Sequence, residues 1–212
     1  MTEIKNLKVL DKGYVELVDM LGDEKRITDV ACISYGKKES KNNLRLLKIL
    51  LDNGHYSPLE HVQFTFKVKA PIFVARQWMR HRTGKYNEQS RRYTKKKWEY
   101  YVPNIFRLGD TQNNCEQIQQ QIKDEMESQI QNYEHLIKTG VTPEIARITM
   151  GTGFYTKFYF TIDLRNLLHF LKLRKDKHAQ FEMQEYARAI ENIVHSCLPN
   201  VINFWMENNG PR

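Results

Sequence analysis

Apolar and polar residues alternate strictly along residues 61–71. The apolar positions are Val62, Phe64, Phe66 and Val68. Because successive side chains of a strand point to opposite faces, this alternation predicts a half-buried strand, most easily in an antiparallel sheet. Residues 14–21 and the aromatic-rich residues 154–163 are predicted to form two further strands.

Apolar residues at helical spacing predict several helices between these strands. Residues 41–53 place Leu44, Leu47 and Leu51 on one face, with Ser40 as the expected N-cap and Gly54 as the stop signal. Pro71 suits the first turn of a helix, which we expect to run over residues 72–82.

The second half of the chain is predicted to be largely helical. Residues 115–139 carry an apolar stripe at near-helical spacing, which indicates a long amphipathic helix closed by Gly140. A short helix is expected at 142–150, and Asp163 is a suitable N-cap for a helix at 164–174. Residues 178–197 are predicted to form the last helix, ended by Pro199.

This order of elements favours an α+β fold with a mostly antiparallel sheet flanked by helices, because strands and helices do not alternate regularly. No G-x-G-x-x-G follows a strand, and no P-loop motif is present, so a Rossmann fold and a P-loop protein are disfavoured. No low-complexity stretch divides the chain, so we expect one domain over residues 1–212.

Composition narrows the functional classes. Lys and Arg exceed Asp and Glu by 33 to 25, a net charge of +8 that attracts anions, so phosphate-bearing partners are expected. No secretory signal or long apolar stretch is present, which predicts a cytoplasmic protein without a membrane partner. Cys32, Cys115 and Cys197 lack metal or disulfide spacing, and the neighbours Glu60 and His61 should point to opposite faces, so no metal is expected.

The stretch from Arg76 to Tyr93 is the most suggestive chemically. It is rich in arginine and adds neutral hydrogen-bonding groups and one carboxylate, Glu88. Guanidinium groups bind phosphate bidentately, whereas amides and a carboxylate suit sugar and base edges. A charge-capped helix end explains Arg80, His81 and Arg82 equally well on their own. The loop that follows them shifts the balance toward a nucleotide site.

These residues resemble the flavin-dependent thymidylate synthases. The run Arg80-His81-Arg82, seven residues and then Ser90 matches the R-H-R-x7-S signature of that family, and "NEQSRRY" matches its continuation. The segments "GHYSPLEHVQFTFKVKAPIFVARQW" and "FYFTIDLRNLLHFLKLRKDKHAQFEMQEYA" are similar to other family motifs. The resemblance covers most of residues 14–205.

The resemblance implies an activity, its cofactors and its assembly. The reaction would be the reductive methylation of dUMP to dTMP, with 5,10-methylenetetrahydrofolate as carbon donor, FADH2 as hydride donor and NADPH to regenerate the reduced flavin. The resemblance also implies a homotetramer with shared active sites. A chain of this size without a phosphate loop would hardly surround three such ligands alone.

The resemblance also implies roles for individual positions. The positions that match nucleotide-binding residues are Gln77, Arg80, Glu88, Gln89, Ser90, Arg91, Arg92, Arg147 and Arg174. The positions that match FAD-binding residues are Ser57, Arg80, His81, Arg82, Glu88, Asp163, Arg165 and His169, with His55 and His178 near the flavin.

Arg174 is the candidate catalytic residue. A guanidinium against the N3/O4 edge of uracil would stabilise negative charge developing in the ring, and that charge makes C5 nucleophilic. No cysteine nucleophile is then required, and none of the three cysteines lies in a matched motif. Ser90 is preferred as a hydrogen-bond donor to the nucleotide, because no adjacent base is evident.

Three positions depart from the pattern of many relatives, namely Lys85, Asp163 and His169. Two alternatives therefore remain. A flavin- or nucleotide-binding protein without synthase activity would retain the cofactor but not the reaction. A basic nucleic-acid-binding protein would string its cations along one groove and bind in a strongly salt-dependent manner.

Overall fold

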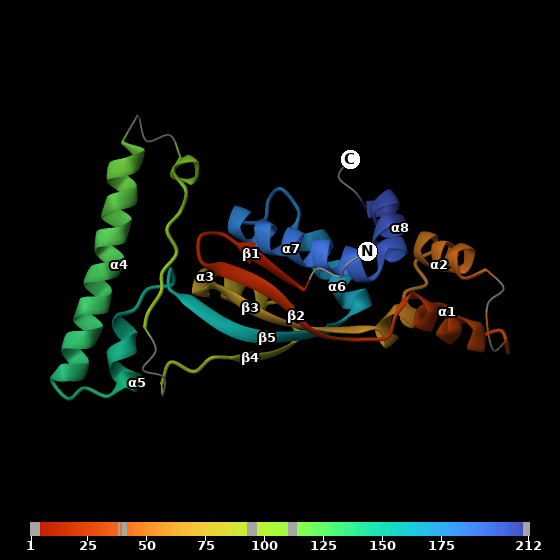
Figure 1. The fold of residues 1–212 in the computed structure, drawn as a ribbon, viewed down its shortest axis with the longest axis horizontal. Helices are drawn as coiled ribbons and strands as arrows, with labels where there is room; N and C mark the ends of the chain where they lie inside the picture. The colour runs from red at the N-terminus through yellow and green to blue at the C-terminus, as the bar shows by residue number, and fades with distance from the viewer. Residues whose placement is uncertain (1–4, 38, 40–41, 93–96, 110–113, 210–212) are drawn as a thin grey trace.

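A five-stranded antiparallel sheet is the centre of the computed structural model, which describes residues 5–37, 39, 42–92, 97–109 and 114–209 (Figure 1). In spatial order its strands are β1 (Asn6–Val9), β2 (Gly13–Leu21), β3 (Gln63–Pro71), β5 (Tyr155–Asp163) and β4 (Lys85–Glu88). Every neighbouring pair is antiparallel. The predicted α+β class with an antiparallel sheet is confirmed.

The described residues also form eight α-helices and three short 3-10 helices. The α-helices are α1 (Glu24–Ile33), α2 (Asn43–Asp52), α3 (Ile72–Trp78), α4 (Cys115–Lys138), α5 (Pro143–Ala146), α6 (Leu164–Arg174), α7 (Phe181–Cys197) and α8 (Pro199–Asn209). The 3-10 helices are η1 (Ser57–His61), η2 (Ile105–Arg107) and η3 (Arg147–Thr149). None of these helices is long and apolar enough to cross a membrane.

The main core lies between one face of the sheet and the helices α3, α6 and α7 (Figure 1). Phe66 of β3 pairs with Phe160 of β5, and both side chains are fully buried. Trp78 at the end of α3 packs edge-on against Phe160 at 5.5 Å and lies 5.2 Å from Phe170 of α6. Aromatic packing of this kind fixes the ends of α3 and α6 beside each other.

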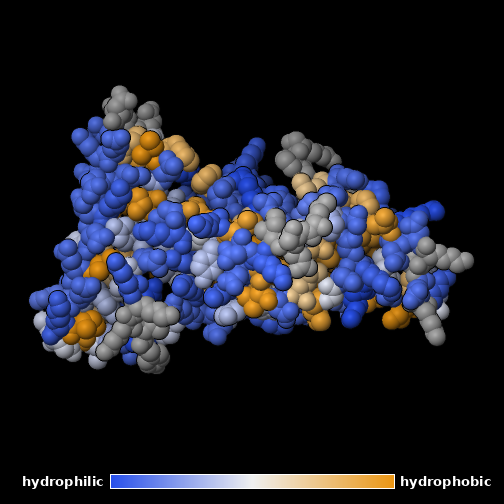
Figure 2. All heavy atoms as spheres, viewed as in Figure 1, coloured by the Kyte–Doolittle hydropathy of each residue, from blue (hydrophilic) through white to orange (hydrophobic). Residues whose placement is uncertain are grey.

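The opposite face of the sheet is more polar, in agreement with the alternation along β3. Thr65 of β3 and Thr161 of β5 are partly buried partners on that face, with their hydroxyl oxygens 3.0 Å apart. The molecular surface in Figure 2 is largely hydrophilic, with hydrophobic residues in separate patches. One-sided burial is the usual arrangement for an antiparallel sheet.

A second, smaller core lies at one end of the molecule, where α4 stands beside α5 (Figure 1). Its buried members are Trp98, Tyr133, Ala146 and Phe154. The predicted long amphipathic helix is confirmed, and Gly140 has the left-handed backbone conformation (φ 92°) that ends a helix without steric penalty.

The helix expected over residues 72–82 is shorter than predicted, because α3 ends at Trp78. The backbone N–H of His81 donates to the carbonyl of Trp78 at 3.0 Å, and this turn redirects the chain. Residues 85–88 then pair with β5 as β4, where a loop was expected. The R-H-R run therefore lies after the helix in a turn, not on its last turn.

Several smaller predictions are corrected as well. Ser40 lies outside the described residues, and Asn42 is the N-cap of α2, because its side chain accepts from the backbone N–H of Arg45 at 2.9 Å. Leu44 is 53% exposed and does not join the core. β1, α1 and α8 were not predicted, so the helix before Pro199 is not the last one.

Candidate active site

The first group of predicted site residues meets where α3 and α6 end. The Nε of Arg174 donates to Nε2 of His81 at 2.8 Å, and its Nη2 donates to the backbone carbonyl of Gln77 at 3.1 Å. That carbonyl belongs to the last turn of α3, where carbonyl groups lack helical partners and carry partial negative charge. Arg174 is thus held by two acceptors.

His81 is a buried, neutral acceptor at neutral pH. Its ring packs edge-on against Phe170 at 4.9 Å, and the ring of His169 lies 6.3 Å away. Burial, the charge of Arg174 and the proximity of His169 lower the pKa of His81 to about 4. Protonation would place a second cation against the guanidinium in a partly desolvated position.

Tyr86 of β4 completes this junction, although sequence reasoning did not single it out. Its hydroxyl donates to the carbonyl of His81 at 2.9 Å and lies 3.3 Å from that of Trp78. Its ring stacks on Phe160 at 5.2 Å, and burial raises its pKa well above the ordinary value. The only available signal was its place between Lys85 and Asn87 inside the matched motif.

Gln77, Arg80 and Arg82 provide groups for a ligand around this junction. The side-chain oxygen Oε1 of Gln77 is buried and has no hydrogen-bond partner among the described residues. Arg80 and Arg82 are exposed, and neither forms an ion pair within the described part of the chain. Unpaired guanidiniums beside an unsatisfied amide suit an anionic, hydrogen-bonding ligand.

A second group lies at the other end of β4. Glu88 accepts from the hydroxyl of Thr156 at 2.6 Å, and the backbone N–H of Gln89 donates to the carbonyl of Lys157 at 2.8 Å. Arg91 turns inward, because its Nη2 donates to the carbonyl of Tyr155 at 3.1 Å. Burial lowers the pKa of Arg91. Because its guanidinium already bonds a backbone carbonyl, part of the role of Arg91 is structural.

Ser90, Arg92 and Arg147 meet beside α5. The Oγ of Ser90 accepts from the backbone N–H of Arg92 at 3.2 Å, and Arg92 pairs with Glu144 at 3.0 Å. Nε of Arg147 donates to the carbonyl of Glu144 at 3.3 Å. Glu144 therefore connects Arg92 with Arg147, which is distant in sequence, and Ser90 bonds the backbone of Arg92.

A third group lies around the start of α6. Asp163 is the N-cap of α6, as predicted, and accepts from the backbone N–H of Asn166 at 3.0 Å. Arg165 forms an ion pair with Glu60 of η1, the element that begins at Ser57. Glu60 and His61 therefore lie in a 3-10 helix, not at the strand start that was expected.

His55 lies two residues before Ser57 of η1, and His178 lies four residues after Arg174. His55 is exposed just beyond α2, and His178 is exposed between α6 and α7, with its Nδ1 2.8 Å from a carboxylate oxygen of Asp176. Within the described ranges no set of three or more His, Cys, Asp or Glu residues is arranged to hold a metal ion.

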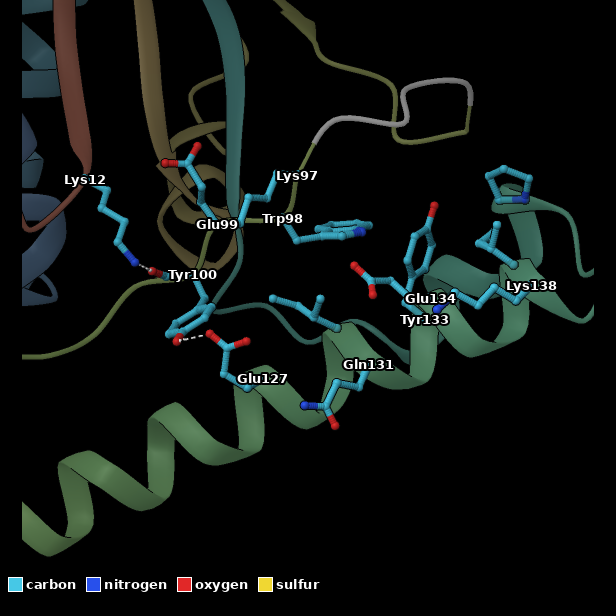
Figure 3. A pocket seen from close by; sticks show the side chains of 13 residues that line it. Lys12, Lys97, Trp98, Glu99, Tyr100, Glu127, Gln131, Tyr133, Glu134 and Lys138 are labelled. Atoms are coloured by element: carbon cyan, nitrogen blue, oxygen red, sulfur yellow. Dashed lines mark hydrogen bonds between the residues drawn. The ribbon is translucent and has the colours of Figure 1, made fainter.

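A cleft of about 720 Å³ lies between α4 and the segment at residues 97–100, where Arg91 lies 4.3 Å from the ring of Trp98 (Figure 3). Trp98 and Tyr133 face each other inside it, and the hydroxyl of Tyr100 bonds to Glu127 at 2.6 Å. None of the predicted site residues lines this cleft. The candidate active site is instead open on the surface of the single chain.

The fold and these groups define a class of protein: an α+β protein whose antiparallel sheet presents arginine, amide and hydroxyl groups for an anionic ligand. The family of thymidylate synthase complementing proteins matches residues 16–200. A flavin-dependent thymidylate synthase from Thermotoga neapolitana is 45% identical over 195 residues, with 91% of this chain and 90% of the relative covered. The corresponding protein from Thermosipho africanus is 46% identical over 205 residues, with the same coverage.

Solved structures agree with these matches. The UMP/dUMP methylase PolB from Streptomyces cacaoi, bound with 5-Br dUMP, superposes with a TM-score of 0.86 and 28% sequence identity. The match covers 95% of this chain and 97% of that chain. The chain belongs to the family of flavin-dependent thymidylate synthases, so the resemblance found in its sequence is confirmed and the protein is an enzyme.

Proposed function

We propose that the protein converts dUMP to dTMP by reductive methylation, with 5,10-methylenetetrahydrofolate as carbon donor and NADPH to regenerate reduced FAD. When bound and reduced, FAD supplies the hydride. The central observation is the fixed guanidinium of Arg174 beside His81. The names of the relatives and the dUMP analogue bound to the structural neighbour support the same substrate.

Arg174 stabilises negative charge in the pyrimidine. Its Nε and Nη2 donate to His81 and to the carbonyl of Gln77, which leaves three of its five N–H groups for the N3/O4 edge of uracil. A positioned donor lowers the barrier when charge develops beside it, and here that charge makes C5 nucleophilic. Burial and Arg80 lower the pKa of Arg174, but a guanidinium remains charged at neutral pH.

No enzyme thiol takes part in this scheme. Cys32 is buried in α1, Cys115 begins α4 and Cys197 ends α7. None of these positions belongs to the junction of α3, β4 and α6 that holds Arg174. A covalent attack on the pyrimidine ring therefore has no evident nucleophile at this junction.

The nucleotide phosphate fits the group beside α5. Ser90 offers a hydroxyl, and Arg92 and Arg147 offer guanidinium groups that share Glu144 as a partner. A doubly charged phosphate competes well for such donors. Gln77, with its unsatisfied side-chain oxygen, would accept a hydrogen bond from the nucleotide at the other group.

The residues around α6 fit a flavin cofactor. Arg80 and Arg82 are exposed cations without a carboxylate partner among the described residues, which suits the pyrophosphate of FAD. Ser57, Arg165 and His169 lie on η1 and one side of α6 and would hold other parts of the cofactor. Asp163 already caps α6, so its carboxylate has a structural function in addition.

We propose that a homotetramer completes the site. In one chain, the group around Arg174 and the group beside α5 lie at opposite ends of β4 and are open to solvent. Substrate pockets normally bury most of a ligand, and none of the predicted site residues lines the 720 Å³ cleft, although Arg91 contacts Trp98 at its edge. Neighbouring copies would enclose the ligands between such surfaces.

Tritium release from C5-labelled dUMP tests the reaction directly, with methylenetetrahydrofolate, NADPH and FAD present. We expect Arg174→Lys to lower turnover by about 100-fold or more, because a point charge does not replace the guanidinium, while bound flavin is retained. Arg188→Lys is the matched control, since Arg188 pairs with Glu185 on α7 away from the junction.

Three results would contradict the proposal. A purified protein that retains flavin but releases no tritium would be a flavin-binding protein without synthase activity. Colourless protein that binds nucleic acid with a steep salt dependence would favour the nucleic-acid alternative. Full activity in Arg174→Lys would refute the role of the guanidinium.

A further inference from the structure

We infer that His81 is a positioning residue whose Nε2 lone pair orients the guanidinium of Arg174 for the pyrimidine ring. The inference rests on the proposed function for the reaction itself. It also concerns a hydrogen bond of the ligand-free protein, which is observable without any activity.

The guanidinium has two edges on which paired N–H groups lie parallel. One edge consists of Nε and Nη2, and here it faces the ring of His81 and the carbonyl of Gln77. The other edge consists of Nη1 and Nη2 and remains for a planar partner. O4 of uracil accepts from this edge, and N3 is a second, coplanar acceptor beside it once N3 has lost its proton and the ring carries negative charge.

The hydrogen bond from Nε of Arg174 to Nε2 of His81 requires a neutral imidazole. Arginine has five donors and no acceptor, so Nε2 of His81 at 2.8 Å has to provide the lone pair. A neutral imidazole has one protonated nitrogen, and the proton of His81 therefore sits on Nδ1. An imidazolium would have donors at both nitrogens and would lose this bond.

The surroundings hold the imidazole in this position. Phe170 of α6 packs against the ring, and the hydroxyl of Tyr86 donates to the backbone carbonyl of His81. The titratable groups beside the ring are Arg174 and His169, and Arg80 and Tyr86 act in turn on Arg174. Two of them are cations and none is a carboxylate, so the local charge also favours the neutral ring.

Glycine at position 84 permits this arrangement. A Cβ atom there would lie 2.5 Å from Cε2 of Phe160 and 2.9 Å from the hydroxyl of Tyr86. The turn that follows the R-H-R run therefore closes tightly onto the aromatic residues. The backbone of His81 is fixed by the same closure, because the N–H of Gly84 donates to its carbonyl at 3.1 Å.

Two amide substitutions separate positioning from other functions. In His81→Gln the side-chain oxygen can take the place of Nε2 and accept from Arg174. In His81→Asn the shorter side chain places its amide near the position of Nδ1 and does not reach. We expect His81→Asn to lower turnover per bound flavin by about 100-fold, the typical result of misplacing a reacting group by 1 Å. His81→Gln should restore most of that loss.

His195→Gln is the control for replacing a histidine by glutamine away from the junction. His195 lies on α7, where it contacts Asn203 at 3.0 Å on the surface. Turnover and flavin content of this variant should equal those of the unmodified enzyme. Thermal unfolding of all three variants shows whether His81→Gln and His81→Asn are equally folded, so that their rates are comparable.

The tautomer of His81 provides a second measurement that needs no activity. Long-range ¹H–¹⁵N spectra of the ligand-free protein should show an unprotonated Nε2 and a protonated Nδ1 at pH 7. In Arg174→Lys, this preference should weaken, because the Nε donor is gone.

Several outcomes would overturn the inference. Equal turnover per bound flavin in His81→Gln and His81→Asn would do so, as would a protonated Nε2 in the ligand-free protein. Turnover that only follows flavin content would make His81 a flavin contact and not a positioning residue. If the unmodified enzyme releases no tritium, the proposed function fails, whereas the tautomer still decides whether His81 holds Arg174.

Discussion

Replacing Tyr86 by phenylalanine removes one hydroxyl and leaves the stacked ring in place. That hydroxyl donates to the carbonyl of His81 at 2.9 Å and lies 3.3 Å from that of Trp78. A hydrogen bond of this kind contributes about 1 kcal/mol net, and the longer contact contributes less. We therefore expect Tyr86→Phe to lower the free energy of unfolding by about 1–2 kcal/mol. For a chain of this size, about 1 kcal/mol corresponds to roughly 2–4 °C in Tm.

Urea unfolding and calorimetry at one fixed protein concentration measure this difference, because an oligomer is stabilised by its own concentration. Tyr159→Phe is the matched control, since Tyr159 is 45% exposed on β5 and its hydroxyl should contribute within about 0.5 kcal/mol. Turnover of Tyr86→Phe should also fall, because the backbone of His81 loses a support. Equal stability of the two variants would refute the argument that this hydroxyl ties β4 to the end of α3.

Three further predictions concern the same part of the chain. Asp163→Ala should lower the free energy of unfolding by about 1 kcal/mol in urea titrations, whereas Asp163→Asn should be nearly neutral, because both Asp and Asn cap helices well. The pKa of His81 is about 4 in the folded protein and 6.5 as its ordinary value, so between these pH values the unfolded chain binds the extra proton and stability should fall as pH decreases. Urea titrations should show a smaller fall in His81→Gln. Replacing all three cysteines by alanine should preserve tritium release per folded enzyme, and a specific loss would indicate covalent catalysis; the positions are Cys32, Cys115 and Cys197.

The strands were predictable where burial is one-sided or the sequence is strongly aromatic. Alternation along residues 61–71 gave both the strand and its buried face, since Phe64, Phe66 and Val68 are fully buried. By contrast, β1 and β4 have four residues each and no clear alternation, and they form because β2 and β5 provide edges to pair with. β4 pairs with a strand that is distant in sequence, which leaves no local signal, whereas β1 pairs with the next strand but is too short to show a pattern.

Helix boundaries were likewise predictable only where the signal is local in the sequence. Asp163 and Gly140 were found because a capping side chain and a positive φ are local requirements. The end of α3 was not predicted, because the turn after Trp78 depends on the contact of Tyr86 with β5 and on the bond from Arg174 to the carbonyl of Gln77. α8 was not predicted, because Pro199 is a stop signal for the preceding helix, although proline also occupies the first turn of a helix.

The identities of the site residues could be recognised, but their mutual arrangement could not. Arg174 and His81 are 93 positions apart, and the packing of Trp78 against Phe170 helps to bring α3 and α6 together. Their contact also changes the charge that the R-H-R run is expected to carry. A row of three side chains that suggests three positive charges contains two exposed arginines and a buried neutral acceptor between them.

That difference matters for the chemistry at this junction. If His81 were charged, the guanidinium of Arg174 would meet another cation on its Nε edge and would turn away from the carbonyl of Gln77. The arginine would then be as mobile as Arg80 or Arg82 at the surface, and a mobile donor must be ordered during the reaction. A neutral histidine at the centre of a basic motif is therefore what allows the partly buried guanidinium of Arg174 to be fixed before the substrate arrives.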